Sequence, residues 1–328
     1  MPRKKKKKVF LSASRMKTME TCSWLYWCKY HLNLPDKTND GALRGSICHL
    51  ILELLLKPRH KKHYDAIMAA KDIAASVPVN RTVIKFLKAN DAWSEENYSL
   101  CNKMIYVALD HDYFGGEGGH IDKPEEEFRI ENKKPKYNIY GFIDKPIQFK
   151  DKKFLKIVDY KTSKQKFKGD ELETNIQAMM YSLAAKKLWP KLKRRVVQFL
   201  FLKFPRSPAQ ELEYSDEQLK GFEYYLERVN KIVEKFDEKA AKSDYAVNNG
   251  HQWLCGPAKS GWICPFHKPF NHYVLLDSDG NQVGKSSYEN DFQPEDGQTV
   301  EERHYEGCPA KNCDAKNSLQ DDDPFLDF

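Results

Sequence analysis

The most informative part of the sequence is Gly141-Phe142-Ile143-Asp144, followed after a turn by Lys156-Ile157-Val158-Asp159-Tyr160-Lys161-Thr162. Both segments are rich in β-branched and aromatic residues, which predicts two β-strands. Alternate side chains of a strand lie on one face, so Asp159 and Lys161 are expected to point the same way. If the two strands pair as a hairpin, Asp144 comes beside Asp159 and the two carboxylates provide hard oxygen ligands for Mg²⁺ or Mn²⁺.

Two carboxylates, a divalent cation and a lysine are the groups that hydrolysis of a phosphodiester bond requires. The cation polarises the phosphoryl oxygen and lowers the pKa of a bound water, while the lysine orients that water or stabilises the transition state. The same residues also fit a simpler interpretation, a surface Asp–Lys pair across a hairpin, which is common and contributes little to stability. The wider sequence has to decide between the two interpretations.

Outside this hairpin, the hydrophobic pattern predicts an α/β protein. Helices are expected at residues 12–34, 41–56, 57–110, 171–188 and 215–241, the last with a capping box at Ser215 and Gln218. Strands are expected at residues 128–130, 138–149, 154–161 and 195–204. The order of these elements predicts a mixed central sheet flanked by helices.

Five short motifs together resemble the RecB-like branch of the PD-(D/E)XK nuclease superfamily, which includes CRISPR-associated RecB-like exonucleases and many phage exonucleases. In family order over about residues 12–204 they are Ser12 to Arg15 with Cys22, Gly45 to His49, Gly141 to Asp144, Val158 to Thr162, and Gln177 with Tyr181. The resemblance implies a restriction-endonuclease-like core with a helical insertion at about residues 57–120. It also implies a DNA nuclease that uses Mg²⁺ or Mn²⁺.

The resemblance also implies a role for each matching residue. The metal ligands are expected to be His49, Asp144 and Asp159. Lys161 is similar to the catalytic lysine, and Gln177 and Tyr181, which share a helix face, are similar to the pair that supports the site. Two alternatives stay open: Tyr181 could be only a core aromatic, and His49 could be structural, with Glu53 one turn away as its partner. Glu125 to Glu127 could add a ligand or could form a solvated charge run.

The eight cysteines are expected to be reduced, because no secretory signal is visible at the start of the chain. Four thiolates from two loops, Cys255 with Cys264 and Cys308 with Cys313, could bind a structural zinc ion. The family resemblance instead implies a [4Fe-4S] cluster held by Cys22, Cys264, Cys308 and Cys313, with Cys255 as an alternative ligand. Plain buried thiols are the third interpretation, and they are expected for Cys28, Cys48 and Cys101.

Length and charge predict how the chain is organised. With 328 residues, 41% of them hydrophobic, and no apolar run near the ~18 residues of a membrane span, a cytoplasmic protein of a bacterium or a phage-infected host is expected. We expect a basic arm at 1–10, the nuclease domain at 11–245, a Cys-containing irregular subdomain at 246–313 and an acidic aromatic tail at 314–328. The tail could bind replication or recombination proteins, or could serve only solubility.

The function expected from these observations is a stand-alone exonuclease used in DNA replication, recombination or degradation, for which a phage origin would be suitable. DNA is the expected partner, and a backbone-binding patch is expected at Lys191, Lys193, Arg194 and Arg195. Two alternatives stay open. One is a structure-selective or nicking endonuclease with the same site, and the other is a non-catalytic DNA-binding or recombination protein on the same fold.

Overall fold

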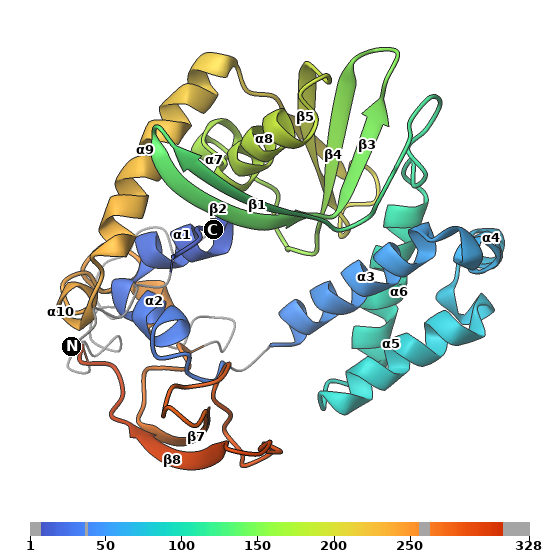
Figure 1. The fold of residues 1–328 in the computed structure, drawn as a ribbon. Helices are drawn as coiled ribbons and strands as arrows, with labels where there is room; N and C mark the ends of the chain where they lie inside the picture. The colour runs from blue at the N-terminus through green and yellow to red at the C-terminus, as the bar shows by residue number, and fades with distance from the viewer. Residues whose placement is uncertain (1–7, 37–38, 256–262, 311–328) are drawn as a thin grey trace, which may run out of the picture. The chain divides into compact units, whose positions relative to one another are not determined.

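The computed structural model describes residues 8–36, 39–255 and 263–310 (Figure 1). The chain forms two compact units: Met1–Ala13 with Thr38–Asn230, and Ser14–Lys37 with Lys231–Phe328. Each unit is described below by itself. Within the described residues, no helix combines the length and the apolar character that crossing a membrane demands.

A four-stranded sheet forms the centre of the first unit. Its order is β3-β4-β5-β6, with bounds Lys145–Phe149, Phe154–Lys161, Arg194–Phe201 and Ala209–Leu212. β4 and β5 are parallel while the outer pairs are antiparallel, which confirms the mixed α/β sheet predicted from the sequence. Helix α8 (Ile176–Leu188) packs on β5, and residues 196–201 of that strand are buried, as its nearly continuous apolar sequence predicts.

The strand predicted over 138–149 is two strands, so the expected meander is wrong at this point. β2 (Lys136–Ile143) pairs with β1 (Glu126–Lys133) in a separate two-stranded sheet, and β3 begins at Lys145 in the central sheet. The change of sheet falls at Asp144, whose carboxylate accepts a hydrogen bond from the backbone amide of Tyr160 at 3.0 Å. The residue between the two strands therefore carries one of the predicted carboxylates.

Four helices complete the first unit, with bounds Asp40–Leu56 (α3), Lys61–Ala70 (α4), Val77–Ala89 (α5) and Glu95–Leu109 (α6). The continuous helix predicted over 57–110 is interrupted by turns in which Lys71 and Asp91 have positive φ angles of 56° and 52°. The apolar faces of the helices share one core with the ends of the central strands, including Ile51, Ile105 and Leu200. This packing holds α3 against the edge of the sheet.

The second unit contains α1 (Ala13–Thr21), α2 (Ser23–Tyr30), α10 (Glu238–Ala241) and the end of α9 (Asp216–Glu234). α9 begins at the predicted capping box, where the amide of Gln218 donates to the Ser215 hydroxyl and the amide of Ser215 donates to the Gln218 side chain. A hairpin of β7 (Phe270–Leu276) and β8 (Thr299–Tyr305) lies in the region expected to be irregular. The sequence pattern did not show β8 because this strand is almost entirely polar and exposed.

Candidate active site

The two carboxylates predicted as ligands lie beside each other across the β3–β4 hairpin. Lys145 pairs with Val158, so the next position in the same register places Asp144 opposite Asp159. Asp159 is 2% exposed, and its Oδ1 atom accepts hydrogen bonds from Gln177 Nε2 at 2.8 Å and from the Tyr181 hydroxyl at 2.9 Å. The hairpin and helix α8 together position this buried carboxylate.

Lys161 and Gln177 complete a closed network around Asp159. Nζ of Lys161 lies 2.7 Å from Oδ2 of Asp159 and donates to Oε1 of Gln177 at 2.6 Å. Gln177 Nε2 also donates to the Tyr181 hydroxyl at 2.7 Å, as the i, i+4 spacing of the two residues permits. Tyr181 is buried with its ring against Phe128, and its hydroxyl contacts Asp159 and Gln177, so it is more than a core aromatic.

His49 approaches the carboxylates from helix α3. Its Nδ1 atom lies 3.3 Å from Oδ2 of Asp144, and its Nε2 atom lies 3.0 Å from the backbone oxygen of Tyr160. Burial opposes the charged ring, but hydrogen bonding to Asp144 and the negative charge of that carboxylate raise the pKa of His49 to about 9. Glu53 pairs instead with Lys57 at 2.7 Å.

A glycine permits this close approach of α3. A Cβ atom at Gly45 would lie 3.0 Å from the hydroxyl oxygen of Thr162, so a larger residue would require the Thr162 side chain or the helix to shift by a few tenths of an ångström. Gly45 precedes His49 by one turn of α3.

One observation bears on whether these residues fit a divalent cation. Nζ of Lys161, 2.7 Å away, is paired with Oδ2 of Asp159, and among the described residues this buried oxygen has no other hydrogen-bond partner. Burial raises the pKa of Asp159, against the charge of Lys161, because a buried carboxylate charge is costly. A buried carboxylate oxygen whose partner is a single ammonium group fits a cation ligand.

Within the described ranges, no three His, Cys, Asp or Glu side chains form a complete ligand group by themselves. Mg²⁺ does not require such a group, because it is commonly bound by one or two carboxylates and completes its shell with water and phosphate oxygens. Asp144 and Asp159 would hold the ion, with His49 as the further candidate. A bound cation would polarise the phosphoryl oxygen and activate water.

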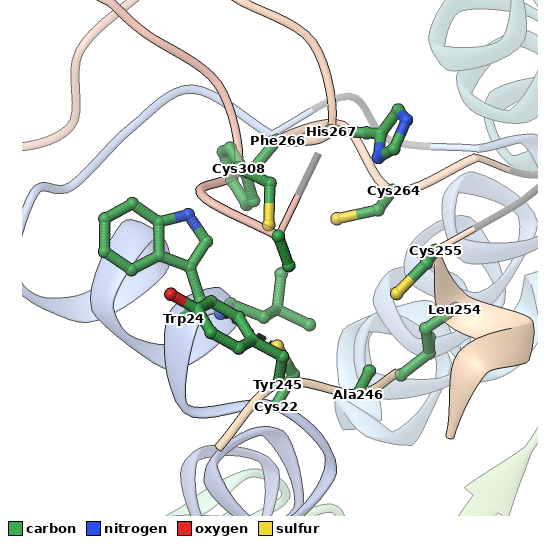
Figure 2. A pocket seen from close by; sticks show the side chains of 12 residues that line it. Cys22, Trp24, Tyr245, Ala246, Leu254, Cys255, Cys264, Phe266, His267 and Cys308 are labelled. Carbon is green, nitrogen blue, oxygen red and sulfur yellow. Dashed lines mark hydrogen bonds between the residues drawn. The ribbon is translucent and has the colours of Figure 1, made fainter. Parts of the chain in front are cut away.

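The structure also brings together cysteines that are far apart in the sequence. Cys22, Cys255, Cys264 and Cys308 line one pocket of the second unit, whose other walls include Trp24, Leu25 and Phe266 (Figure 2). Burial raises the pKa of the Cys264 thiol to about 12. Cys313, a predicted ligand, lies outside the described residues. Cys28, Cys48 and Cys101 are fully buried as predicted.

Three features of the active site have no signal in the sequence. The backbone amide of Tyr160 donates to the carboxylate of Asp144, and its backbone oxygen contacts Nε2 of His49. Backbone contacts of this kind cannot be predicted from residue types. Burial, followed by the charges of Glu53 and Asp144, raises the pKa of Glu125, so one residue of the predicted charge run lies near the carboxylates. The fully buried Lys145, 1% exposed, directly follows Asp144.

The basic patch predicted at residues 191–195 lies at the other end of the sheet from these residues. Arg194 pairs with Phe154 at the start of β4 and β5, whereas Lys161 pairs with Phe201 at their ends. The guanidinium of Arg194 is also neutralised by Glu213, with donor–acceptor distances of 3.1 and 3.2 Å. This patch is therefore separated from the carboxylates by the length of the strands.

Comparison with known proteins gives a family match over most of the chain. A model of the PD-(D/E)XK nuclease superfamily matches residues 10–267. Among solved structures, the chain is similar to a protein named "Putative exonuclease" from Eubacterium rectale, with 13% sequence identity, a TM-score of 0.45, and coverage of 78% of this chain and 89% of that chain. No protein with curated annotation matches the chain.

Proposed function

Because the chain belongs to the PD-(D/E)XK nuclease superfamily, we propose that it is a Mg²⁺- or Mn²⁺-dependent deoxyribonuclease of the RecB-like type, acting as an exonuclease in DNA replication, recombination or degradation. The observation that carries this proposal is the network of Asp144, Asp159, Lys161 and Gln177 at the junction of β2, β3 and β4. A non-catalytic relative would be expected to have lost at least one of these groups.

Each residue of the site has a separate role in the proposed reaction. Asp144 and Asp159 provide negative oxygens at one place, which is the requirement for holding a cation against a phosphate. Lys161 places an ammonium group beside the same carboxylate, where it orients the attacking water or stabilises the charge of the transition state. Gln177 contacts both Lys161 and Asp159, and it therefore fixes the distance between the ammonium and the carboxylate.

Digestion of end-labelled linear DNA and closed circular DNA tests the mode of attack. We expect linear DNA to be degraded from its ends with Mg²⁺ or Mn²⁺, closed circles to resist, and a chelator to stop the reaction. Cleavage of the closed circle would instead identify the structure-selective or nicking endonuclease alternative. If neither substrate is cleaved with either cation, while both are bound, the chain is the non-catalytic DNA-binding or recombination protein.

For the cysteine pocket we propose a [4Fe-4S] cluster, with a structural zinc ion as the alternative. The support is that four thiols from distant segments line one largely apolar pocket. Cys255, which was predicted only as an alternative ligand, is one of these four thiols.

Anaerobic purification tests this assignment. The parent protein is expected to be brown, to absorb visible light and to contain iron and sulfide. Cys264→Ala is expected to be colourless, because it removes a ligand, whereas Cys101→Ala, a buried cysteine outside the pocket, is expected to keep the colour. One zinc per chain in a colourless protein would establish the zinc alternative. An anaerobic preparation without either metal would show that the thiols are only buried side chains.

The acidic aromatic tail at residues 314–328 lies outside the described residues. Its predicted binding to replication or recombination proteins stays a prediction, as does a phage origin. DNA remains the proposed substrate.

A further inference from the structure

The ends of β4 and β5 bring together three basic side chains that have no assigned role. The two strands are parallel and in register up to Lys161 and Phe201, and the backbone amide of Leu202 donates to the oxygen of Lys161 at 2.8 Å. The segments that follow, with Lys164 and Lys203, therefore leave the sheet side by side. The contact between Gly45 and Thr162 brings α3, with Arg44, to the same place.

These three cations have no acidic partner. In the part of the chain that the structure describes, Arg44, Lys164 and Lys203 make no ion pair with a carboxylate. Arg44 donates through Nη1 to the neutral side chain of Asn97, and its buried Nε has no hydrogen-bond partner. The three cations therefore have no ion pair among the described residues, and for the partly buried Arg44 and Lys203 this lack costs free energy.

The electrostatics of Lys203 agree with this arrangement. Burial, followed by the positive charges of Arg44 and Lys164, lowers the pKa of the Lys203 ammonium. No carboxylate is among the groups that act on it. Since the like charges repel one another, an anion bound between them would lower the free energy of all three.

We propose that Arg44, Lys164 and Lys203 form a binding site for a phosphate of the DNA strand next to the bond that is cleaved. This inference rests on the proposed nuclease function and extends it with a substrate contact. Lys164 follows the catalytic lysine candidate by three residues, and Arg44 directly precedes Gly45, which approaches Thr162 just after β4. The site therefore lies at the end of the strand that carries Asp159 and Lys161. Arg44 and the two lysines supply the charged donors that phosphate oxygens accept.

The position of this site contrasts with the basic residues at the start of β4. Lys150 and Lys152 are exposed lysines of the turn between β3 and β4, and β4 runs for eight residues from Phe154 to Lys161. At ~3.3 Å per residue, the two ends of that strand are separated by roughly 20 Å. Lys150 and Lys152 are therefore matched controls, because they carry the same charge at the opposite end of the strand.

The test compares DNA binding by Lys164→Ala and Lys203→Ala with binding by Lys150→Ala and Lys152→Ala. Fluorescence anisotropy of a labelled single-stranded oligonucleotide, in a chelator that prevents cleavage, gives Kd at several salt concentrations. We expect each site variant to raise Kd by roughly five-fold, the scale of one charge pair. The slope of log K against log salt should also fall by ~0.7 per lost phosphate contact. The control variants should keep the parent Kd and slope.

Oligonucleotides with a 5′-phosphate, a 5′-hydroxyl or a 3′-phosphate distinguish two sources of the phosphate. An equal loss with all three identifies an internal phosphodiester, and a loss only with one phosphorylated end identifies a terminal phosphate. The inference is overturned if both site variants bind like the two controls. If the parent protein never cleaves DNA but the site variants still bind it more weakly, the nuclease proposal fails while the phosphate site stands. Thermal melting of all four variants shows whether each is folded.

Discussion

Replacing Lys161 with alanine is expected to reduce cleavage by about 10²- to 10³-fold or more, the range seen when one group that stabilises a transition state is removed. The reason is its position: Nζ lies 2.7 Å from Oδ2 of Asp159, a buried oxygen that has no other partner among the described residues. Asp159→Asn should cause at least as large a loss, because the amide removes the negative charge that a cation needs. Single-turnover cleavage of end-labelled DNA measures both losses.

A matched control exists on the same strand. Lys156 lies five positions before Lys161, so it points to the other face of β4, where it pairs with Glu211 at 3.5 Å. Lys156→Ala should therefore cleave at the parent rate. Tyr181→Phe should show an intermediate loss, because Gln177 still donates to Oδ1 of Asp159. Parent-like cleavage by Lys161→Ala or Asp159→Asn would contradict the proposed mechanism, provided that both bind DNA.

Replacing the buried Lys145 with methionine is expected to stabilise the protein by a few kcal/mol at neutral pH. Lys145 is 1% exposed. Among the described residues, its ammonium donates only to the backbone oxygen of Tyr113, at 3.3 Å, and it lies over the rings of Tyr113 and Tyr160. Burial lowers the pKa of this lysine to about 7, although the charge of Asp112 opposes the change. An unfolded lysine has a pKa of ~10.4, so the folded chain bears the cost of burying or deprotonating this group.

The pH dependence follows from the direction of this shift. Between pH ~7 and ~10 the unfolded state holds the proton of Lys145 more tightly than the folded state, so this group makes stability rise with pH, by up to ~1.4 kcal/mol per unit. The raised pKa of His49 acts in the opposite direction up to pH ~9 in the parent and in the variants alike, so the difference between them reports Lys145. Below pH ~7 the full cost is present. Lys145→Met should lack this slope, and Lys150→Met, at an exposed position, should keep it. Urea unfolding in a chelating buffer at pH 7 and pH 9 measures the difference; equal slopes in parent and Lys145→Met would contradict the explanation.

Much of the central sheet could be predicted from local pattern. The continuous apolar run of β5 predicted a strand buried on both faces, and the period of two placed Asp159 and Lys161 on one face of β4. The i, i+4 spacing likewise placed Gln177 and Tyr181 together on α8. These features depend on residues close in sequence, whose relative positions are set by helix and strand geometry.

The sequence-based predictions that were wrong concern segments whose structure depends on contacts with distant parts of the chain. The strand over 138–149 changes sheets at Asp144, the helix over 12–34 breaks where Cys22 caps α2 through its sulfur, and a polar hairpin stands in the region expected to be irregular. Each depends on what a segment packs against. The role predicted for residues 191–195 in DNA binding stays a prediction, and the structure adds only that these residues lie at the end of the strands opposite to Lys161.

Residue type and spacing alone were enough to specify the pair of carboxylates, the lysine beside them and the helix that supports them, because strand and helix geometry act over a few residues. Packing between distant segments decided the remainder. It placed His49 and Arg44 of α3 beside the ends of β4 and β5, gave the backbone of Tyr160 a part in the site, and brought Cys255 to the pocket with Cys22. Such contacts depend on which surfaces meet in the folded core, and local backbone preferences carry no information about that.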